Sequence, residues 1–288
     1  MSVSQWPLQR LGRWRRVAPA AVLSAAVVLI AAAPGRAPAD VGTQGVPTIT
    51  MSGSTSVAPL AARLAQKYVQ NHNVQFRLSQ GGSDIGISDV AHGRVDIGNS
   101  SRDPKPTDPG GITFRKIAKD AICVITNNSN NLPNLSQNGV QAVFSGQVRH
   151  WNQVPGATRG SNVIDLFVRN VASGTQDAFE KLFMDPKDVN NSIAKQLSSN
   201  GLVQQRVKDD SNGIGYVSLF FATGVNPVAY KGVACNLRNA KSGQYGGLRN
   251  FWMVTRGSQP QRAVDFIKWV QNSSAANSII GTNWVPLH

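Results

Sequence analysis

Short stretches of strand periodicity alternate with stretches of helical periodicity along the chain, and this alternation constrains the fold most. Residues 48–51 alternate polar and apolar side chains, and apolar positions then recur at helical spacing over residues 57–68. A continuous apolar run at residues 121–126 predicts a buried strand. Strands that alternate with helices are typical of an α/β fold with parallel sheets.

The same patterns predict the remaining elements. We expect strands at residues 74–78, 95–98, 164–168, 214–217 and 251–255. We expect helices at residues 85–92, 135–144, 176–184 and 260–271. The last of these is strongly amphipathic, which predicts that one of its faces covers a sheet.

The first 39 residues have the order of a secretory signal peptide. A basic segment at residues 10–16 precedes an apolar run at 17–33 and a small-residue cleavage site that ends at Ala39. A membrane anchor is the alternative, but Pro19 interrupts the run, and a membrane span needs about 20 apolar residues. We therefore expect cleavage near Ala39 and a periplasmic or secreted protein.

The chain is basic, with a formal net charge of +14. Five of its arginines lie in the first 39 residues, which contain no acidic residue. The remaining positive charges are scattered rather than gathered in blocks, which argues against nucleic-acid binding. A basic protein outside the cytoplasm instead attracts small anions.

The chain has two cysteines, Cys123 and Cys235, which have no CxxC spacing. A metal or redox motif is therefore not indicated. In an oxidising compartment the two can pair, and a disulfide is slightly favoured over two separate buried thiols.

Three predicted junctions, each just before a helix, combine hydroxyl side chains with glycine: residues 53–56, 81–83 and 173–175. A helix start offers unpaired N–H groups and a partial positive charge, and glycine lets the backbone approach a ligand closely. Arg169 lies four residues before the third junction and can bind two oxygens at once. Together these features favour an oxyanion site. At each single junction, an ordinary helix N-cap is the alternative.

Several segments resemble the motifs of PstS-type phosphate-binding proteins of bacterial uptake systems. GSTSVAPL at residues 53–60 is similar to their first motif, and GGSDIG at 81–86 followed by VDIG at 95–98 is similar to their second. Further segments follow in family order at residues 99–102, 121–127, 144–151, 169–179, 213–216 and 281–287. The resemblance covers about residues 48–287.

The resemblance implies the two-lobed type II periplasmic-binding-protein fold, in which each lobe has a mostly parallel sheet flanked by helices. After a signal peptide at residues 1–39, lobe one would comprise 40–122 plus 252–288, and lobe two would comprise 123–251. The ligand would lie in the cleft between the lobes of a monomer, and no cofactor or metal is expected.

The resemblance also implies the ligand residues. The phosphate-binding positions would be Ser54, Thr55, Ser56, Ser83, Ser100, Ser101, Arg169, Ser173, Gly174 and Thr175. Some family members have, at the position of Ser101, an aspartate that accepts a proton from the bound anion. Asp84 or Asp177 can replace it as the proton acceptor, although either can simply complement the dipole of a helix N-terminus.

The expected function is therefore capture of inorganic phosphate and its delivery to a membrane ABC permease, without catalysis. A binding protein for another oxyanion, such as sulfate or molybdate, is one alternative, because sulfate needs no proton acceptor. A secreted phosphatase is another. A phosphatase needs an activated nucleophile, and the sequence has neither a G-x-S-x-G elbow nor a paired histidine motif.

Overall fold

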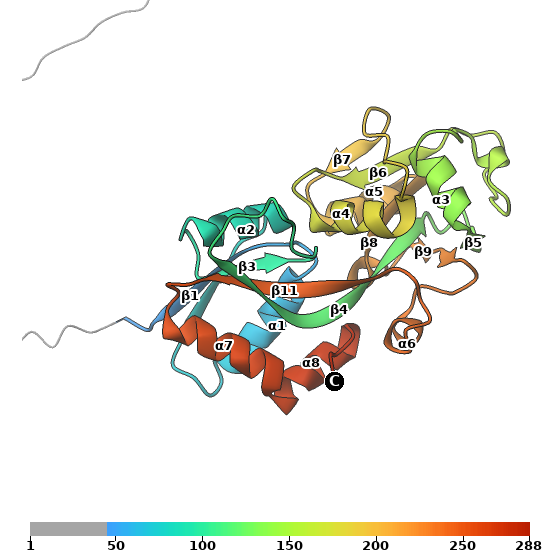
Figure 1. Ribbon diagram of the computed structural model, residues 1–288. Helices are drawn as coiled ribbons and strands as arrows, with labels where there is room; N and C mark the ends of the chain where they lie inside the picture. Colours follow the sequence, from blue (N-terminus) through green and yellow to red (C-terminus); the bar gives the residue numbers. More distant parts are fainter. Residues whose placement is uncertain (1–44) are drawn as a thin grey trace, which may run out of the picture. The chain divides into compact units, whose positions relative to one another are not determined.

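The computed structural model describes residues 45–288 (Figure 1). The expected signal peptide at residues 1–39 and its cleavage site near Ala39 lie outside the described residues. No helix within residues 45–288 is long and apolar enough to cross a membrane.

Strands and helices alternate along much of this part of the chain, as the sequence patterns predict. The strands are β1 (Thr48–Gly53), β2 (Gln75–Leu78), β3 (Ile97–Ser100), β4 (Ile112–Thr126), β5 (Asn134–Leu135), β6 (Asp165–Arg169), β7 (Lys195–Leu197), β8 (Gly213–Ser218), β9 (Asn226–Pro227), β10 (Ala229–Tyr230) and β11 (Leu248–Arg256). The helices are α1 (Ala58–Tyr68), α2 (Ser83–Ala91), α3 (Gln137–Phe144), α4 (Gly174–Phe179), α5 (Asn200–Asp209), α6 (Leu237–Lys241), α7 (Gln261–Asn272) and α8 (Ser274–Asn283). Single helical turns are η1 (Trp151–Gln153), η2 (Glu180–Met184) and η3 (Leu219–Phe221).

The main sheet has the strand order β2-β1-β3-β11-β4-β8-β6-β7, with β9 also paired to β4. At one end β1 runs parallel to both β2 and β3, and at the other end β6 runs parallel to both β7 and β8. The predicted α/β fold with parallel strands is thus confirmed at both ends of the sheet.

The two long strands β4 and β11 run side by side between these ends (Figure 1). They are antiparallel, so the sheet is mixed at its centre and parallel toward its ends. The sequence predicted only residues 121–126 of β4, because these are continuously apolar. Residues 112–120 mix exposed and buried positions, the pattern of a strand with one solvated face, so strand β4 begins earlier than predicted.

The described chain has two large hydrophobic cores. The first core gathers buried side chains of β1, α1, α7 and α8, and the second gathers those of β6, β8, α3 and the last part of β4. We call the part around the first core the first half (β1–β3, α1, α2, α7 and α8) and the part around the second core the second half (β5–β10 and α3–α6). Strands β4 and β11 run through both halves. The exact lobe boundaries, 40–122 plus 252–288 and 123–251, stay a prediction.

The helix predicted at residues 176–184 is divided. It begins earlier, as α4 at Gly174, and continues from Glu180 as the π-helical turn η2. Helix α5 was not predicted, because Val203 and Val207 are its only buried apolar side chains. The third buried residue of α5 is Asn200, which belongs to the site described below.

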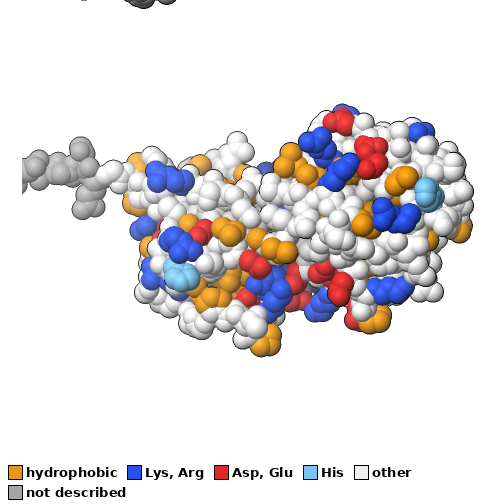
Figure 2. Space-filling view, turned by 90° about the horizontal axis from the view of Figure 1, so that it is seen from above, with side chains coloured by type: hydrophobic (Ala, Val, Ile, Leu, Met, Phe, Trp, Pro, Cys, Tyr) orange, Lys and Arg blue, Asp and Glu red, His pale blue; other side chains and the backbone are white. Residues whose placement is uncertain are grey.

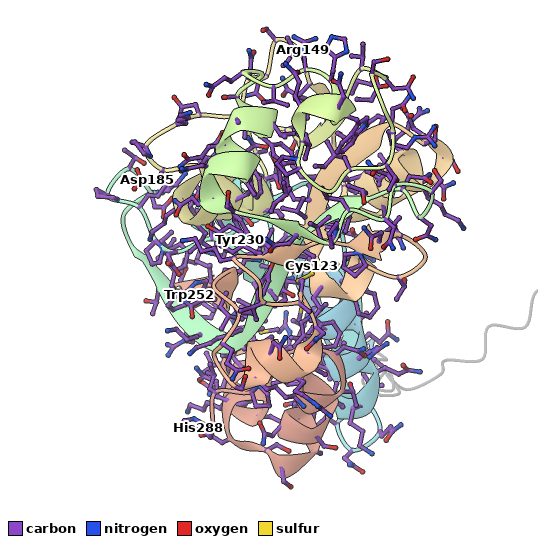
Figure 3. The ribbon with its side chains drawn as sticks, turned by 90° about the vertical axis from the view of Figure 1, so that its right-hand side faces the viewer. Cys123, Arg149, Asp185, Tyr230, Trp252 and His288 are labelled. Carbon is purple, nitrogen blue, oxygen red and sulfur yellow. A yellow bond between two sulfur atoms is a disulfide. The ribbon has the colours of Figure 1, made fainter. Side chains whose placement is uncertain are left out.

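Cys123 and Cys235 form a disulfide in the second half, with their Cα atoms 5.7 Å apart (Figure 3). It joins β4 to the segment before α6 across a sequence separation of 112 residues. A cross-link over so long a loop restricts the unfolded chain strongly.

On the face shown in Figure 2, Lys and Arg side chains are interspersed with acidic and neutral groups. This face has no continuous basic stripe of the kind that follows a nucleic-acid backbone.

Candidate functional site

Three chain segments that each precede a helix meet at one buried point between the two halves. Thr55 and Ser56 follow β1, Ser83 begins α2, and Thr175 lies in the first turn of α4. Ser56 Oγ, from the first half, is 2.9 Å from Thr175 Oγ1, from the second half. All four side chains are at most 4% exposed. The three predicted junctions therefore form one site.

Ser101 connects the two junctions of the first half. Ser54 Oγ donates a hydrogen bond to Ser101 Oγ over 2.8 Å, and the backbone N–H of Ser101 donates to Ser83 Oγ over 3.0 Å. The six residues that bring their hydroxyls together are called the hydroxyl cluster below: Ser54, Thr55, Ser56, Ser83, Ser101 and Thr175.

Two glycines allow the halves to approach each other this closely. A Cβ atom on Gly174 would lie 2.3 Å from Ser83 Oγ. A Cβ atom on Gly82 would lie 2.4 Å from the carbonyl oxygen of Ala172, and Gly82 also has a φ of 114°. Glycine alone fits both positions without displacing the opposite half.

Ser173 acts as a helix cap. Its Oγ accepts hydrogen bonds from the backbone N–H groups of Thr175 and Gln176 at the start of α4. The alternative of an N-cap is therefore realised at this junction. A direct role of Ser173 in ligand binding stays a prediction.

Ser100 makes its contacts within its own turn. Its Oγ donates to the carbonyl oxygen of Arg102 and accepts from the backbone N–H of Arg102. Neighbouring residues of an extended segment point to opposite faces, so Ser101 reaches the hydroxyl cluster and the Ser100 side chain does not.

The two carboxylates predicted as possible proton acceptors bind cations. Asp84 accepts from Arg102 Nε over 2.7 Å, and Asp177 forms an ion pair with Lys105. Within the described chain, neither carboxylate hydrogen-bonds to the hydroxyl cluster. The structure does not bring them together with the cluster, and their role as proton acceptors stays a prediction.

Arg169, at the end of β6, carries a buried charge that binds neutral partners. Its side chain donates to the carbonyl oxygens of Leu197 and Ser198 and, over 3.1 Å, to Thr55 Oγ1 of the first half. Within residues 45–288 no carboxylate forms an ion pair with it. Burial, and to a smaller extent the nearby Arg249, lower the pKa of Arg169 to about 10, so it remains a cation at neutral pH. A buried cation without a counter-ion is costly, and a bound anion would remove this cost.

A second buried arginine, Arg249, was not predicted. It lies on β11 directly opposite Asp120 on β4. Its Nε and Nη2 atoms donate to Asp120 Oδ2 over 3.0 and 2.8 Å. Burial raises the pKa of Asp120 and lowers that of Arg249, while the attraction between the two charges opposes both shifts. The two groups lie at ion-pair distance, and each offsets the charge of the other.

The sequence does contain a signal for this pair. Asp120 directly precedes the apolar run at residues 121–126, and Arg249 lies two residues before the predicted strand at 251–255. A charge at the margin of a buried strand is uncommon unless it is paired. The partner itself depends on the strand register, which the sequence patterns did not give.

A cavity of about 400 Å³ shares Arg249 with the site. Its charged lining residues are the five cations Arg102, Lys105, Lys119, Lys181 and Arg249 and the two carboxylates Asp103 and Asp177. Three further carboxylates, Asp84, Asp108 and Asp120, bind Arg102 and Arg249 from outside the lining, so the charges around this cavity balance.

Comparison with known proteins places the chain in a family. A family model described as the PBP superfamily domain matches residues 38–273. The phosphate-binding protein PstS of Bacillus subtilis (strain 168) is 24% identical over 239 residues, a match that covers 81% of this chain and 78% of that protein.

Two solved structures share the fold and about a quarter of the sequence. A Clostridium perfringens protein solved with bound phosphate has a TM-score of 0.76 and 26% identity, and the match covers 84% of this chain and 100% of that one. An ABC-type phosphate transport receptor from Vibrio cholerae has a TM-score of 0.66 and 26% identity, with coverages of 82% and 99%.

Proposed function

The chain belongs to the PBP superfamily, and from this premise we propose that it is an extracytoplasmic binding protein for inorganic phosphate. The anion is held in the hydroxyl cluster between the two halves and is passed to a membrane ABC permease. The protein acts as a monomer, since one chain supplies the residues from both halves.

The buried charge of Arg169 is the observation that carries this proposal. Arg169 is 1% exposed, and its guanidinium reaches Thr55 across the two halves and has no carboxylate partner within the described chain. With Asp120 paired to Arg249, the three buried ionised groups of the site leave a net charge of +1. An anion with several oxygens matches this charge and the surrounding hydroxyl donors.

The identity of the anion is supported by the relatives. The Bacillus subtilis and Vibrio cholerae proteins are named for phosphate binding and phosphate transport, and the Clostridium perfringens structure contains phosphate. The name of the Vibrio protein also supports delivery to an ABC-type transport system.

The site suits reversible capture rather than catalysis. Hydrogen bonds to a charged partner contribute roughly 1.5–3 kcal/mol each. About five to eight of them together contribute roughly 8–24 kcal/mol, whereas micromolar affinity needs roughly 8 kcal/mol. The free-energy costs of closing the two halves and of ordering side chains are subtracted from this sum. Ser173 uses its Oγ as a helix cap and has no histidine partner among the described residues.

Calorimetric titration of the purified protein with inorganic phosphate tests the proposal. We expect saturable binding at micromolar concentration or below, and at least about tenfold weaker binding for Arg169→Ala, which loses a charged hydrogen-bond donor. Arg77→Ala, an exposed arginine on β2, is the matched control and should bind as the wild type does. If the wild type shows no saturable phosphate binding, the proposed function is wrong.

A further inference from the structure

N–H donors surround three hydroxyls of the cluster. Thr55 Oγ1 accepts from Arg169 Nη1 over 3.1 Å and from Asn200 Nδ2 over 2.9 Å. Ser56 Oγ accepts from Asn200 Nδ2 over 2.8 Å and from Arg249 Nη2 over 2.9 Å. A hydroxyl oxygen has two acceptor positions and one hydrogen. Both acceptor positions of Thr55 and of Ser56 are therefore filled, so each hydroxyl can bind a ligand only by donating its hydrogen. In this structure Ser56 donates its hydrogen to Thr175 Oγ1, and a ligand oxygen would take the place of that acceptor.

Thr175, on the other half, is held in a similar way. Its Oγ1 accepts from Arg249 Nη1 over 2.9 Å. Arg249 thus donates to Ser56 of the first half and to Thr175 of the second half with the two ends of one planar guanidinium. Such a rigid fork fixes both hydroxyls relative to each other when the halves are together.

The orientation of the Asn200 amide is determined by its other bond. Asn200 Oδ1 accepts from the backbone N–H of Ser218 over 3.0 Å, and a backbone N–H can only donate. The Nδ2 atom must therefore face Thr55 and Ser56.

Arg249 has no donor left for a ligand. Its five N–H groups are used by Asp120 twice, by Ser56, by Thr175 and, over 3.4 Å, by the carbonyl oxygen of Ser101. Asp120 is in turn held by Ser218 Oγ over 2.9 Å. Arg249 therefore acts through the hydroxyls that it contacts, and Asp120 offsets its charge.

We propose that Arg249 and Asn200 are positioning residues that turn the hydroxyl hydrogens of Thr55, Ser56 and Thr175 toward the bound anion. Asp120 holds Arg249 in place and lowers the positive charge of the site by one. This inference rests on the proposed function, because it explains how the same site binds its anion.

Arg249→Lys tests the positioning role. The lysine keeps the positive charge but is a point donor that cannot reach Asp120, Ser56 and Thr175 in the geometry of a fork. Phosphate affinity, measured by calorimetry, should fall by about tenfold or more. Arg256→Lys, the same substitution at the outer end of β11, is the control and should change affinity by less than about twofold.

Asp120→Asn separates positioning from a merely structural role. The substitution removes the charge that offsets Arg249 and keeps the shape of the side chain. A buried cation then loses its partner, so the melting temperature of the protein without phosphate should fall. Phosphate should bind more tightly than to the wild type, because the anion then compensates Arg249. A structural role alone predicts a lower melting temperature together with weaker binding.

Asn200→Ala decides the question if Asp120→Asn does not fold. It removes the donor to Thr55 and Ser56 without changing any charge, and it should weaken phosphate binding by about tenfold. Wild-type affinity in both Arg249→Lys and Asn200→Ala would overturn the inference and leave the proposed function intact. Weaker binding in Asp120→Asn would also overturn it. Absence of phosphate binding by the wild type would instead refute the proposed function.

Discussion

Ser56 Oγ and Thr175 Oγ1 lie 2.9 Å apart, although 119 residues separate them in the chain. Each hydroxyl comes from a different half, and both are buried. Their contact brings the helix starts of α1 and α4 to the same point. The loss of either hydroxyl should therefore affect both ligand binding and the closing of the two halves on the ligand.

Thr175→Val removes one of these hydroxyls while keeping the shape of the side chain. The variant loses a donor to the anion and leaves Arg249 Nη1 without its acceptor. Calorimetry should show a loss of about 1.5–3 kcal/mol, or roughly ten- to hundredfold in affinity for phosphate. Thr113→Val, at an exposed position of β4, provides the comparison and should bind normally. Equal affinities of the two variants would show that Thr175 does not contact the ligand.

Gly174→Ala should prevent the closest approach of the halves. The added Cβ would lie 2.3 Å from Ser83 Oγ and 2.9 Å from the backbone nitrogen of Arg102. Such overpacking costs about 1–3 kcal/mol, which should weaken phosphate binding by roughly five- to hundredfold. The melting temperature without phosphate should change little, since without a ligand the two halves can move apart and relieve the contact. Gly110→Ala, where the added atom meets nothing within 4 Å, is the control, and a similar affinity for both variants would contradict this prediction.

The sequence predicts the elements whose periodicity is local. Helix α1 buries Leu60, Ala61, Leu64 and Tyr68, the apolar positions that its spacing singled out. The three hydroxyl junctions were also visible, because glycine and hydroxyl residues before a helix have a local chemical meaning. That the three junctions meet at one point could be expected only from the two-lobed fold that the family resemblance implied.

The sequence does not predict the contacts that depend on strand register. Arg249 and Asp120 are separated by 129 residues and meet because β11 and β4 pair in one particular register. Asn200 was overlooked because the polar helix α5 has a weak apolar pattern. These three residues form most of the network behind the hydroxyl cluster, so this layer of the site became visible only in three dimensions.

The disulfide should stabilise the fold without affecting the ligand. Replacement of both Cys123 and Cys235 by serine releases a loop of 112 residues and should lower the free energy of unfolding by about 2–5 kcal/mol. Neither cysteine contacts the hydroxyl cluster, so phosphate affinity should stay within about twofold. Urea unfolding measures the first effect, and the wild type in reductant should match the double variant. A large loss of affinity in the folded variant would mean that the disulfide holds the site in shape.

Asp84→Asn and Asp177→Asn should change phosphate affinity by less than about threefold. Both carboxylates are partly exposed and engaged by Arg102 or Lys105, and exposed ion pairs contribute about 0–1 kcal/mol. Titrations of the two variants at neutral pH measure the effect. A loss of tenfold or more in one of them would identify that carboxylate as the acceptor of the phosphate proton.

Ser101→Asp should increase discrimination between phosphate and sulfate. Ser101 Oγ lies 2.8 Å from Ser54 Oγ and 3.3 Å from Ser83 Oγ, fully buried, so a carboxylate there would enter the site. Phosphate at neutral pH still carries a proton that it can donate to the carboxylate, whereas sulfate has none and is repelled by the added charge. The ratio of the sulfate Kd to the phosphate Kd should therefore rise by about tenfold or more.

Ser101→Asn is the matched control for this change, because it has the same shape without the charge. Its ratio of the two Kd values should stay close to that of the wild type. If Ser101→Asp and Ser101→Asn gave the same ratio, the charge at this position would not determine selectivity. A wild type that already excludes sulfate completely would also contradict the prediction, because another group of the site would then have to accept the phosphate proton.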